Sequence, residues 1–200
     1  MPVLNSDRER YFQCFFDYVN RLINMPESDQ VICRTFFKPI QVKKGTRIAS
    51  IGSVHHYHNF VVSGYLRKYH IDDHGEEVVV DLNDGPRFFT SYHHFFHRTP
   101  SNECIECVTD CELLRISRDD VDRSSNLGQS QQEYTVLILQ ESLEKQKQRS
   151  IELTTLPAYE RYLKLLERQP NILRHIPLKY VASYLGINPG SLSRIRKEVA

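Results

Sequence analysis

The chain has 200 residues, of which 40% are hydrophobic and 26% charged, with a formal net charge of +1 at pH 7. This balance is typical of globular proteins with one or two domains and excludes a largely disordered or fibrous chain. No apolar run approaches the roughly 20 residues of a transmembrane helix, and residues 1–7 lack the basic start and apolar segment of a secretory signal. We therefore expect a cytoplasmic protein without a membrane partner. The odd number of five cysteines does not predict a disulfide framework.

Charge is distributed unevenly along the chain. Residues 142–200 carry eleven Lys or Arg against five Asp or Glu, a local charge of +6, which leaves −5 for residues 1–141. A basic C-terminal part behind an acidic body indicates a polyanion-binding segment attached to a sensor. A solvated charged face would give the same distribution, so this pattern alone leaves both interpretations open.

The first part of the chain predicts a helix followed by short strands. Over 7–33, apolar residues from Phe12 to Ile23 recur at helical spacing, and Met25-Pro26 punctuates the end. Five of the eight glycines then fall at near-regular intervals that mark turns, and Asp72-Asp73-His74-Gly75 predicts a hairpin turn. Many short strands of this kind predict a closed or rolled antiparallel β structure. The expected strands are Pro39–Lys43, Arg47–Ile51, Phe60–Val62, Tyr65–Ile71, Glu77–Leu82, Cys104–Val108 and Glu112–Ile116.

Helical periodicity returns after Asp119. The stretch 127–153 contains no proline and has a thin apolar stripe, which predicts packing on a partner, most simply a second copy of the chain. A solvated surface helix is the alternative. The residues of this stripe are Tyr134, Leu137, Ile138 and Ile151. From Pro157 we expect three short helices, separated at Pro170, Pro177 and Gly186–Pro189.

The segment Ile176–Lys197 fits a helix-turn-helix. Ala182 is small enough for two helices to cross closely, and Gly186, four residues later, supplies the positive φ that a tight turn needs. Asn188 and Pro189 suit the start of the second helix, because Asn caps free amides and Pro has the required φ. An ordinary helical hairpin with a basic rim is the alternative interpretation.

The second helix of this pair carries polar and cationic side chains suited to base edges and phosphates in a DNA major groove. We therefore predict double-stranded DNA as a partner. The candidate DNA-binding residues are Lys179, Asn188, Ser191, Ser193, Arg194, Arg196 and Lys197.

The order of these elements resembles the Crp/Fnr family of bacterial transcription regulators. The residues that carry the resemblance in the roll are Lys44-Gly45-Thr46-x-Ile48, Gly52, Phe60–Arg67, Gly75-Glu76-Glu77, Leu82-Asn83-Asp84-Gly85 and Glu112–Ser117. Those that are similar to Bacteroidetes-type members are Arg161–Leu166, Ile176–Ile187 and Ser191–Lys197.

The resemblance implies an α+β fold and a dimeric, DNA-binding transcription regulator, for which RNA polymerase is a further candidate partner. The fold would consist of an N-terminal helix and a cyclic-nucleotide-binding-like antiparallel β-roll over 1–124, a long dimerisation helix over 125–153, and a helix-turn-helix over 154–200. Because the chain ends at Ala200, we expect no β-hairpin wing after the second helix.

The sensor roll departs from the cyclic-nucleotide-binding members of the family. Their phosphate-binding Arg-Ser/Thr-Ala stretch falls on Ser101-Asn102-Glu103, and their Gly-Glu pair falls near Phe89-Thr90. The arginine is therefore missing, and Glu103 adds a charge of the wrong sign; Arg87 or Arg98 could substitute only with another geometry. We expect a degenerate ligand pocket at Phe89, Thr90, Ser101, Asn102 and Glu103 that does not bind cyclic AMP. Another small-molecule effector remains open, and no cofactor is assigned.

Two clusters of side chains near this pocket invite a metal hypothesis. His93 and His97 would share one face of a helix and could bind zinc, although a haem ligand or a pH-sensitive pocket are alternatives. We favour a pocket filled by aromatic side chains with histidines on its rim, and hence no metal. Cys104 and Cys107 would point to opposite faces of a strand, so we interpret these two residues and Cys111 as free thiols.

The second helix also departs from the family's cyclic-AMP-responsive type, because Pro189 and Gly190 replace two of its base-reading residues. Base recognition should then depend on Arg194, supported by Ser191 and Asn188. These departures motivate a second hypothesis, in which the chain is a ligand- or metal-binding sensor whose helix-turn-helix contacts a protein. No catalytic motif stands out, so we do not expect an enzyme.

Overall fold

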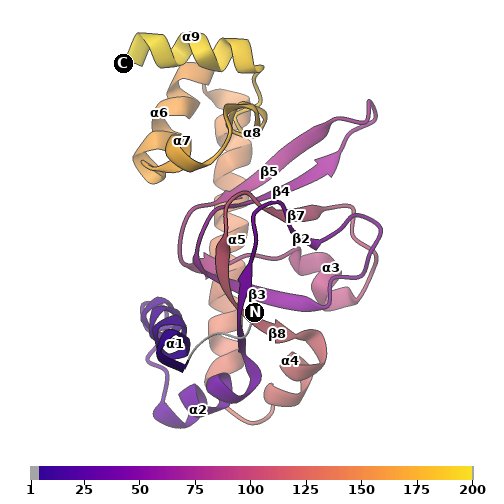
Figure 1. Ribbon diagram of the computed structural model, residues 1–200, viewed down its shortest axis with the longest axis vertical. Coiled ribbons are helices and arrows are strands. Elements are labelled where there is room, and N and C mark those ends of the chain that lie inside the picture. The colour runs from indigo at the N-terminus through magenta and orange to yellow at the C-terminus, as the bar shows by residue number, and fades with distance from the viewer. Residues whose placement is uncertain (1–4, 200) are drawn as a thin grey trace.

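The computed structural model describes residues 5–199. The helices are α1 (Asn5–Val19), α2 (Glu27–Phe36), α3 (Tyr92–His97), α4 (Arg118–Ser124), α5 (Ser130–Thr155), α6 (Ala158–Arg168), α7 (Ile172–His175), α8 (Leu178–Tyr184) and α9 (Pro189–Val199). The strands are β1 (Lys38–Val42), β2 (Arg47–Ala49), β3 (Tyr57–Ser63), β4 (Leu66–Ile71), β5 (Glu77–Asn83), β6 (Arg87–Phe88), β7 (Cys104–Cys107) and β8 (Cys111–Ser117). The β-roll lies between α1–α2 at one end and α6–α9 at the other, and α5 runs along all three parts (Figure 1).

The strands form the antiparallel roll that the sequence predicts. Two four-stranded sheets have the orders β1-β8-β3-β6 and β2-β7-β4-β5. The predicted hairpin joins β4 to β5, where the Asp72 carboxylate accepts hydrogen bonds from the amides of His74 and Glu76, both at 2.9 Å. Gly64 has a φ of +99°, and a Cβ at this position would lie 2.6 Å from the carbonyl oxygen of Asp110. Glycine is therefore required there for both conformation and space.

Several helices differ from those expected. The helix predicted over 7–33 is two helices, because the chain turns between them; the side-chain oxygen of Asn20 accepts a hydrogen bond from the amide of Met25. From Pro157 there are four helices, α6 to α9, where three were expected. Sequence periodicity also missed β6, which is too short to show a clear period, and it did not separate α4 from α5. The expectation of no wing depends on Ala200, and the expectation of no secretory signal depends partly on residues 1–4; these positions lie outside the described residues.

Three of the four residues of the apolar stripe predicted on the long helix pack on the chain's own core, and the fourth, Ile151, is 44% exposed. Tyr134 and Ile138 are buried in the cluster formed by α1, α2 and the roll, and Leu137 packs against that cluster. Another apolar row lies on α5, which we call the α5 stripe: Val136 (53% exposed), Leu139 (half-buried) and Leu143 (67% exposed).

The C-terminal helices are docked on the roll. A single hydrophobic cluster joins Tyr69, Val79 and Leu82 of β4 and β5 to the buried side chains of α6–α9. The backbone amide of Val79 in β5 donates a hydrogen bond to the Ser183 hydroxyl of α8 at 2.9 Å. A side chain of α8 thus binds the backbone of β5 directly. Arg149 of α5 bridges both parts through the carbonyl oxygens of Val79 and Tyr184. Within residues 5–199, no helix is both long and apolar enough to span a membrane.

Candidate functional site

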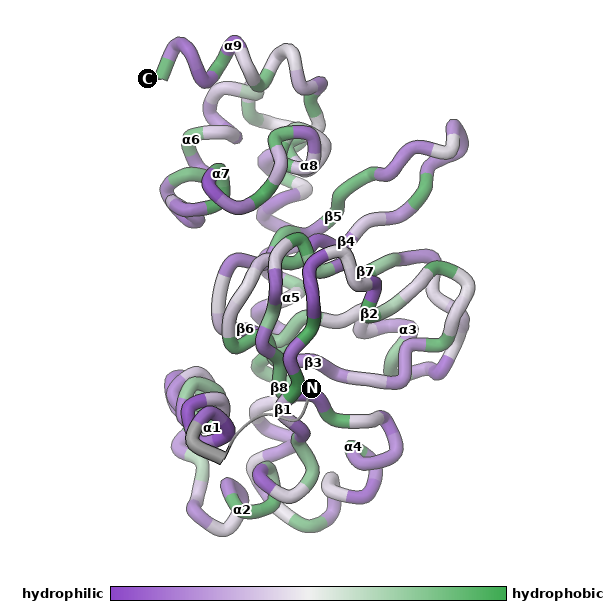
Figure 2. Tube along the Cα trace, viewed as in Figure 1, coloured by the Kyte–Doolittle hydropathy of each residue, from purple (hydrophilic) through white to green (hydrophobic). Residues whose placement is uncertain are grey.

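The two helices α8 and α9 are joined by a tight turn of the kind the sequence predicts. Gly186 has a φ of +66°, and the amide of Ile187 donates to the carbonyl of Ala182 at 3.0 Å. Ala182 is fully buried, as a close crossing requires, and Leu192 and Ile195 of α9 are buried beneath their helix. Along α9 in Figure 2, hydrophilic stretches alternate with short hydrophobic segments. One face of α9 is therefore anchored to the bundle, and the other faces solvent.

The candidate DNA-binding residues are mostly on this solvent face. Ser193, Arg194, Arg196 and Lys197 of α9 are exposed, as are Asn188 before it and Lys179 on α8, whereas Ser191 is half-buried. Asn188 also serves as the helix cap, since its side-chain oxygen accepts the amide of Ser191 at 2.7 Å. The Ser193 hydroxyl donates to the carbonyl of Pro189. The first bond uses the Asn188 side-chain oxygen and the second uses the Ser193 hydroxyl proton, so the four exposed cations provide most of the hydrogen-bonding capacity that remains for DNA.

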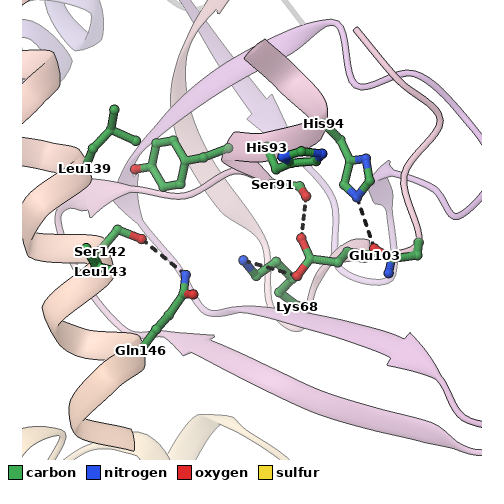
Figure 3. A pocket seen from close by; sticks show the side chains of 11 residues that line it. Lys68, Ser91, His93, His94, Glu103, Leu139, Ser142, Leu143 and Gln146 are labelled. Carbon is green, nitrogen blue, oxygen red and sulfur yellow. Dashed lines mark hydrogen bonds and ion pairs between the residues drawn. The ribbon is translucent and has the colours of Figure 1, made fainter. Parts of the chain in front are cut away.

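A second candidate site is a pocket of about 370 Å³ between the roll and α5. Small-molecule sites commonly have volumes of roughly 300–1,000 Å³. The roll provides β4, α3 and the segment before β7, and α5 provides the opposite wall (Figure 3). The residues that line the pocket are Lys68, Ser91, Tyr92, His93, His94, Asn102, Glu103, Leu139, Ser142, Leu143 and Gln146.

The charged groups of this pocket are Lys68 and Glu103. The Lys68 ammonium lies 3.6 Å from one carboxylate oxygen of Glu103, and the Ser91 hydroxyl donates to the other (Figure 3). The side chain of Lys68 is 8% exposed and that of Glu103 24%. The pocket therefore contains one loosely paired cation and one anion, with no net charge.

The predicted pocket residues are only partly brought together. Asn102 and Glu103 line the pocket, whereas Phe89, Thr90 and Ser101 are buried beside it and do not. Lys68, Ser91 and the α5 residues could not be predicted as pocket residues, because the local sequence of a strand or a polar helix does not indicate which side chains line a cavity.

The two arginines considered as phosphate ligands are engaged elsewhere. Arg87 pairs with Asp81 at 2.9 Å, and Arg98 pairs with Asp119 and Asp122, each at 2.8 Å. Neither arginine lines the pocket.

Comparison with known proteins agrees with this geometry. Residues 39–124 match the family model described as the cyclic nucleotide-binding domain. The roll is therefore similar to a cyclic nucleotide-binding domain. A search of curated proteins finds no match to the chain.

Solved structures share the fold over most of the chain. FixK2 from Bradyrhizobium japonicum has a TM-score of 0.71 at 15% identity, with 82% of this chain and 84% of that chain covered. The c-di-GMP-responsive global regulator CLP from Xanthomonas campestris has a TM-score of 0.67 at 16% identity, with coverages of 87% and 91%. The catabolite activator protein of Thermus thermophilus has a TM-score of 0.56 at 19% identity, with coverages of 89% and 85%. These structures share the fold of the chain at identities of 15–19%.

The histidines of this cyclic nucleotide-binding-like domain include both buried and exposed residues. His93 and His97 are exposed on α3 with ring centroids 4.7 Å apart. Across residues 5–199, no group of three or more His, Cys, Asp or Glu side chains is arranged to hold a metal ion. His58 is buried against Phe88 and Phe95, and desolvation lowers its pKa to about 3.

The cysteines of this domain behave as the strand geometry predicts. Cys104 belongs to the cluster shared with the C-terminal helices, whereas Cys107 and Cys111 belong to the small core inside the roll. Cys104 and Cys107 therefore point to opposite faces of β7, and all three are free thiols.

Proposed function

We propose that the chain is a homodimeric, DNA-binding transcription regulator of the Crp/Fnr type that acts in the cytoplasm. The observation that carries this proposal is the two-sided helix α9, which buries Leu192 and Ile195 and exposes Arg194, Arg196 and Lys197. A helix anchored in this way can enter a major groove with its cations toward bases and phosphates. The local charge of +6 over residues 142–200 supports a polyanionic partner.

The α5 stripe supports a homodimer. Val136, Leu139 and Leu143 are spaced three and four residues apart, which places them on one side of the helix. Pairing of two such stripes would remove apolar surface from water and hold two copies of α9 at a fixed separation. A two-fold site with half-sites about 34 Å apart is the DNA that such a dimer reads.

In this proposal the chain has three functional parts. Residues 1–124 sense a small molecule, residues 125–153 pair the two copies, and residues 154–200 bind DNA, with RNA polymerase as the partner through which the bound regulator acts. No catalytic role is assigned.

The proposed effector is not cyclic AMP. A cyclic phosphate placed at Lys68 would also meet the negative charge of Glu103, which repels it. The pocket offers Lys68, which Glu103 pairs with, and no arginine among its lining residues.

In-vitro selection from random duplex DNA tests the DNA-binding proposal. We expect enrichment of a two-fold-symmetric motif, and Arg194→Ala should weaken binding by about 1–3 kcal/mol and relax one base of each half-site. The matched control is Arg123→Ala, which removes an exposed arginine from α4, far from α9 along the chain. Absence of any salt-dependent DNA affinity, or equal effects of both variants, would overturn the proposal and favour a protein partner for α8 and α9.

A further inference from the structure

The pocket between α3, β4 and α5 contains an ion pair that is incompletely satisfied. Lys68 and Glu103 are 3.6 Å apart, beyond hydrogen-bond distance, although Lys68 is 8% exposed. An ammonium group has three protons to donate, so Lys68, which lines the pocket, can donate to a ligand there. On Glu103, Ser91 donates to one carboxylate oxygen, which leaves the other oxygen facing Lys68.

Two opposite charges at this separation constrain the charge of any ligand. A purely anionic ligand would satisfy Lys68 but meet Glu103, and a purely cationic ligand would satisfy Glu103 but meet Lys68; like charges at such distances repel strongly in a partly buried site. A ligand that carries both a carboxylate and an ammonium group satisfies both residues. Uncharged polar groups of Asn102, Ser142 and Gln146 at the pocket wall can complete its hydrogen bonds.

The far wall of the pocket determines the rest of the ligand. Leu139 and Leu143 of α5 line the side opposite the ion pair (Figure 3), and Tyr92 of α3 also lines the pocket. An apolar group placed there gains contact with carbon atoms and leaves water. The volume of about 370 Å³ accommodates one small molecule.

We propose that this pocket binds a free α-amino acid with an apolar side chain, with its carboxylate on Lys68 and its ammonium on Glu103. The binding itself does not depend on the proposed function; only the role of the amino acid as the effector of the regulator does. The apolar side chain of the ligand then contacts Leu139 and Leu143, which also belong to the α5 stripe. Occupation of the pocket is thereby connected to the surface on which two copies would pair.

Calorimetric titration of the purified chain tests this ligand class directly. The probes are L-leucine, L-methionine and L-phenylalanine, together with L-leucine methyl ester, which lacks the carboxylate, and 4-methylpentanoate, which lacks the ammonium. We expect saturable binding of at least one free amino acid. Each truncated analogue of leucine should bind at least tenfold more weakly than leucine, and cyclic AMP should not bind.

Variants of the ion pair assign each charge to its residue. In Lys68→Met, leucine should bind no better than its methyl ester, and in Glu103→Gln, leucine should bind no better than 4-methylpentanoate. The double variant replaces both charges, so it leaves no buried charge unpaired and should fold while binding neither compound preferentially. Lys44→Met and Glu76→Gln, at exposed positions away from the pocket, are the matched controls and should bind as the unaltered chain does.

The inference is overturned if none of the three amino acids binds, if leucine and its truncated analogues bind equally to the unaltered chain, or if cyclic AMP binds instead. Failure of the DNA selection does not affect these outcomes, because the titration needs no DNA. Conversely, if a symmetric DNA site is enriched but no amino acid binds, the chain is a DNA-binding regulator and amino acids are excluded as its effectors.

Discussion

Arg67 and Lys68 are consecutive residues of β4, and their side chains contact opposite parts of the molecule. The Arg67 guanidinium lies 3.7 Å from the ring centroid of Tyr180 on α8, whereas the Lys68 ammonium faces Glu103 in the pocket. One strand therefore contacts both the pocket and α8.

Arg67→Met should detach the C-terminal helices from the roll. The side chain is 2% exposed and forms ion pairs with Glu77 at 2.5 Å and Glu106 at 2.6 Å, between the rings of Tyr69 and Tyr180. Removing the cation deprives both carboxylates of this partner and should destabilise the fold, most through the better buried Glu106, because Glu77 is 36% exposed and is solvated. We expect a lower urea midpoint and faster hydrogen exchange of α8 amides.

Two variants test the cause of this loss. Arg67→Lys keeps the charge but loses the planar stacking and paired hydrogen bonds, so its stability should lie between those of the unaltered chain and Arg67→Met. Arg47→Met removes an exposed arginine from β2 and should change the free energy of unfolding by less than about 0.5 kcal/mol. Unchanged exchange of α8 in Arg67→Met would show that Arg67 does not hold the docking.

The folded chain should lose stability in mild acid because of His58. Burial lowers the pKa of His58 to about 3 from the ordinary value of 6.5. Between these values the unfolded chain binds a proton that the folded chain does not, so stability falls as the pH decreases through this window, by about 1.4 kcal/mol per pH unit for one such group.

Substitution His58→Phe should flatten this dependence, because phenylalanine fits among Phe88 and Phe95 and does not titrate. The measurement is the free energy of unfolding in urea at pH 7.5, 6.5 and 5.5. His74→Phe, at the exposed hairpin turn, should keep the original slope. Equal slopes in the two variants would contradict the assignment to His58.

The sequence predicts the roll and the helix-turn-helix because their determinants are local. Strand alternation, turn glycines and the small residue Ala182 before Gly186 act within a few residues of each other. The packing partner of α5 is a tertiary property, and the stripe with Tyr134 and Ile138 fits this chain's own core as well as it would fit a second copy. The pocket was predicted at Asn102 and Glu103 through family resemblance, but Lys68 reads from the sequence as an ordinary strand residue.

Alanine substitutions at two glycines with positive φ distinguish the cost of backbone strain from the cost of steric crowding. Gly64 and Gly52 have φ values of +99° and +79°. A Cβ added at Gly64 would lie 2.7 Å from the Cys111 sulfur, whereas a Cβ added at Gly52 would have no atom within 4 Å. Gly52→Ala should cost about 1 kcal/mol from the backbone alone. Gly64→Ala must also displace the β8 backbone, so its urea midpoint should fall well below that of Gly52→Ala; similar midpoints would contradict the crowding.

The α5 stripe should control the mass of the protein in solution. We expect sedimentation equilibrium to give twice the 23.5 kDa of one chain. Leu143→Glu should reduce this to a single chain, because a charge placed in a paired apolar surface must be desolvated without a partner. Val31→Glu changes a residue of α2 with a similar exposure of 62% and should leave the dimer intact. A single-chain mass for the unaltered protein, or dissociation by Val31→Glu as readily as by Leu143→Glu, would contradict pairing through this stripe and with it the fixed separation of two α9 helices on DNA.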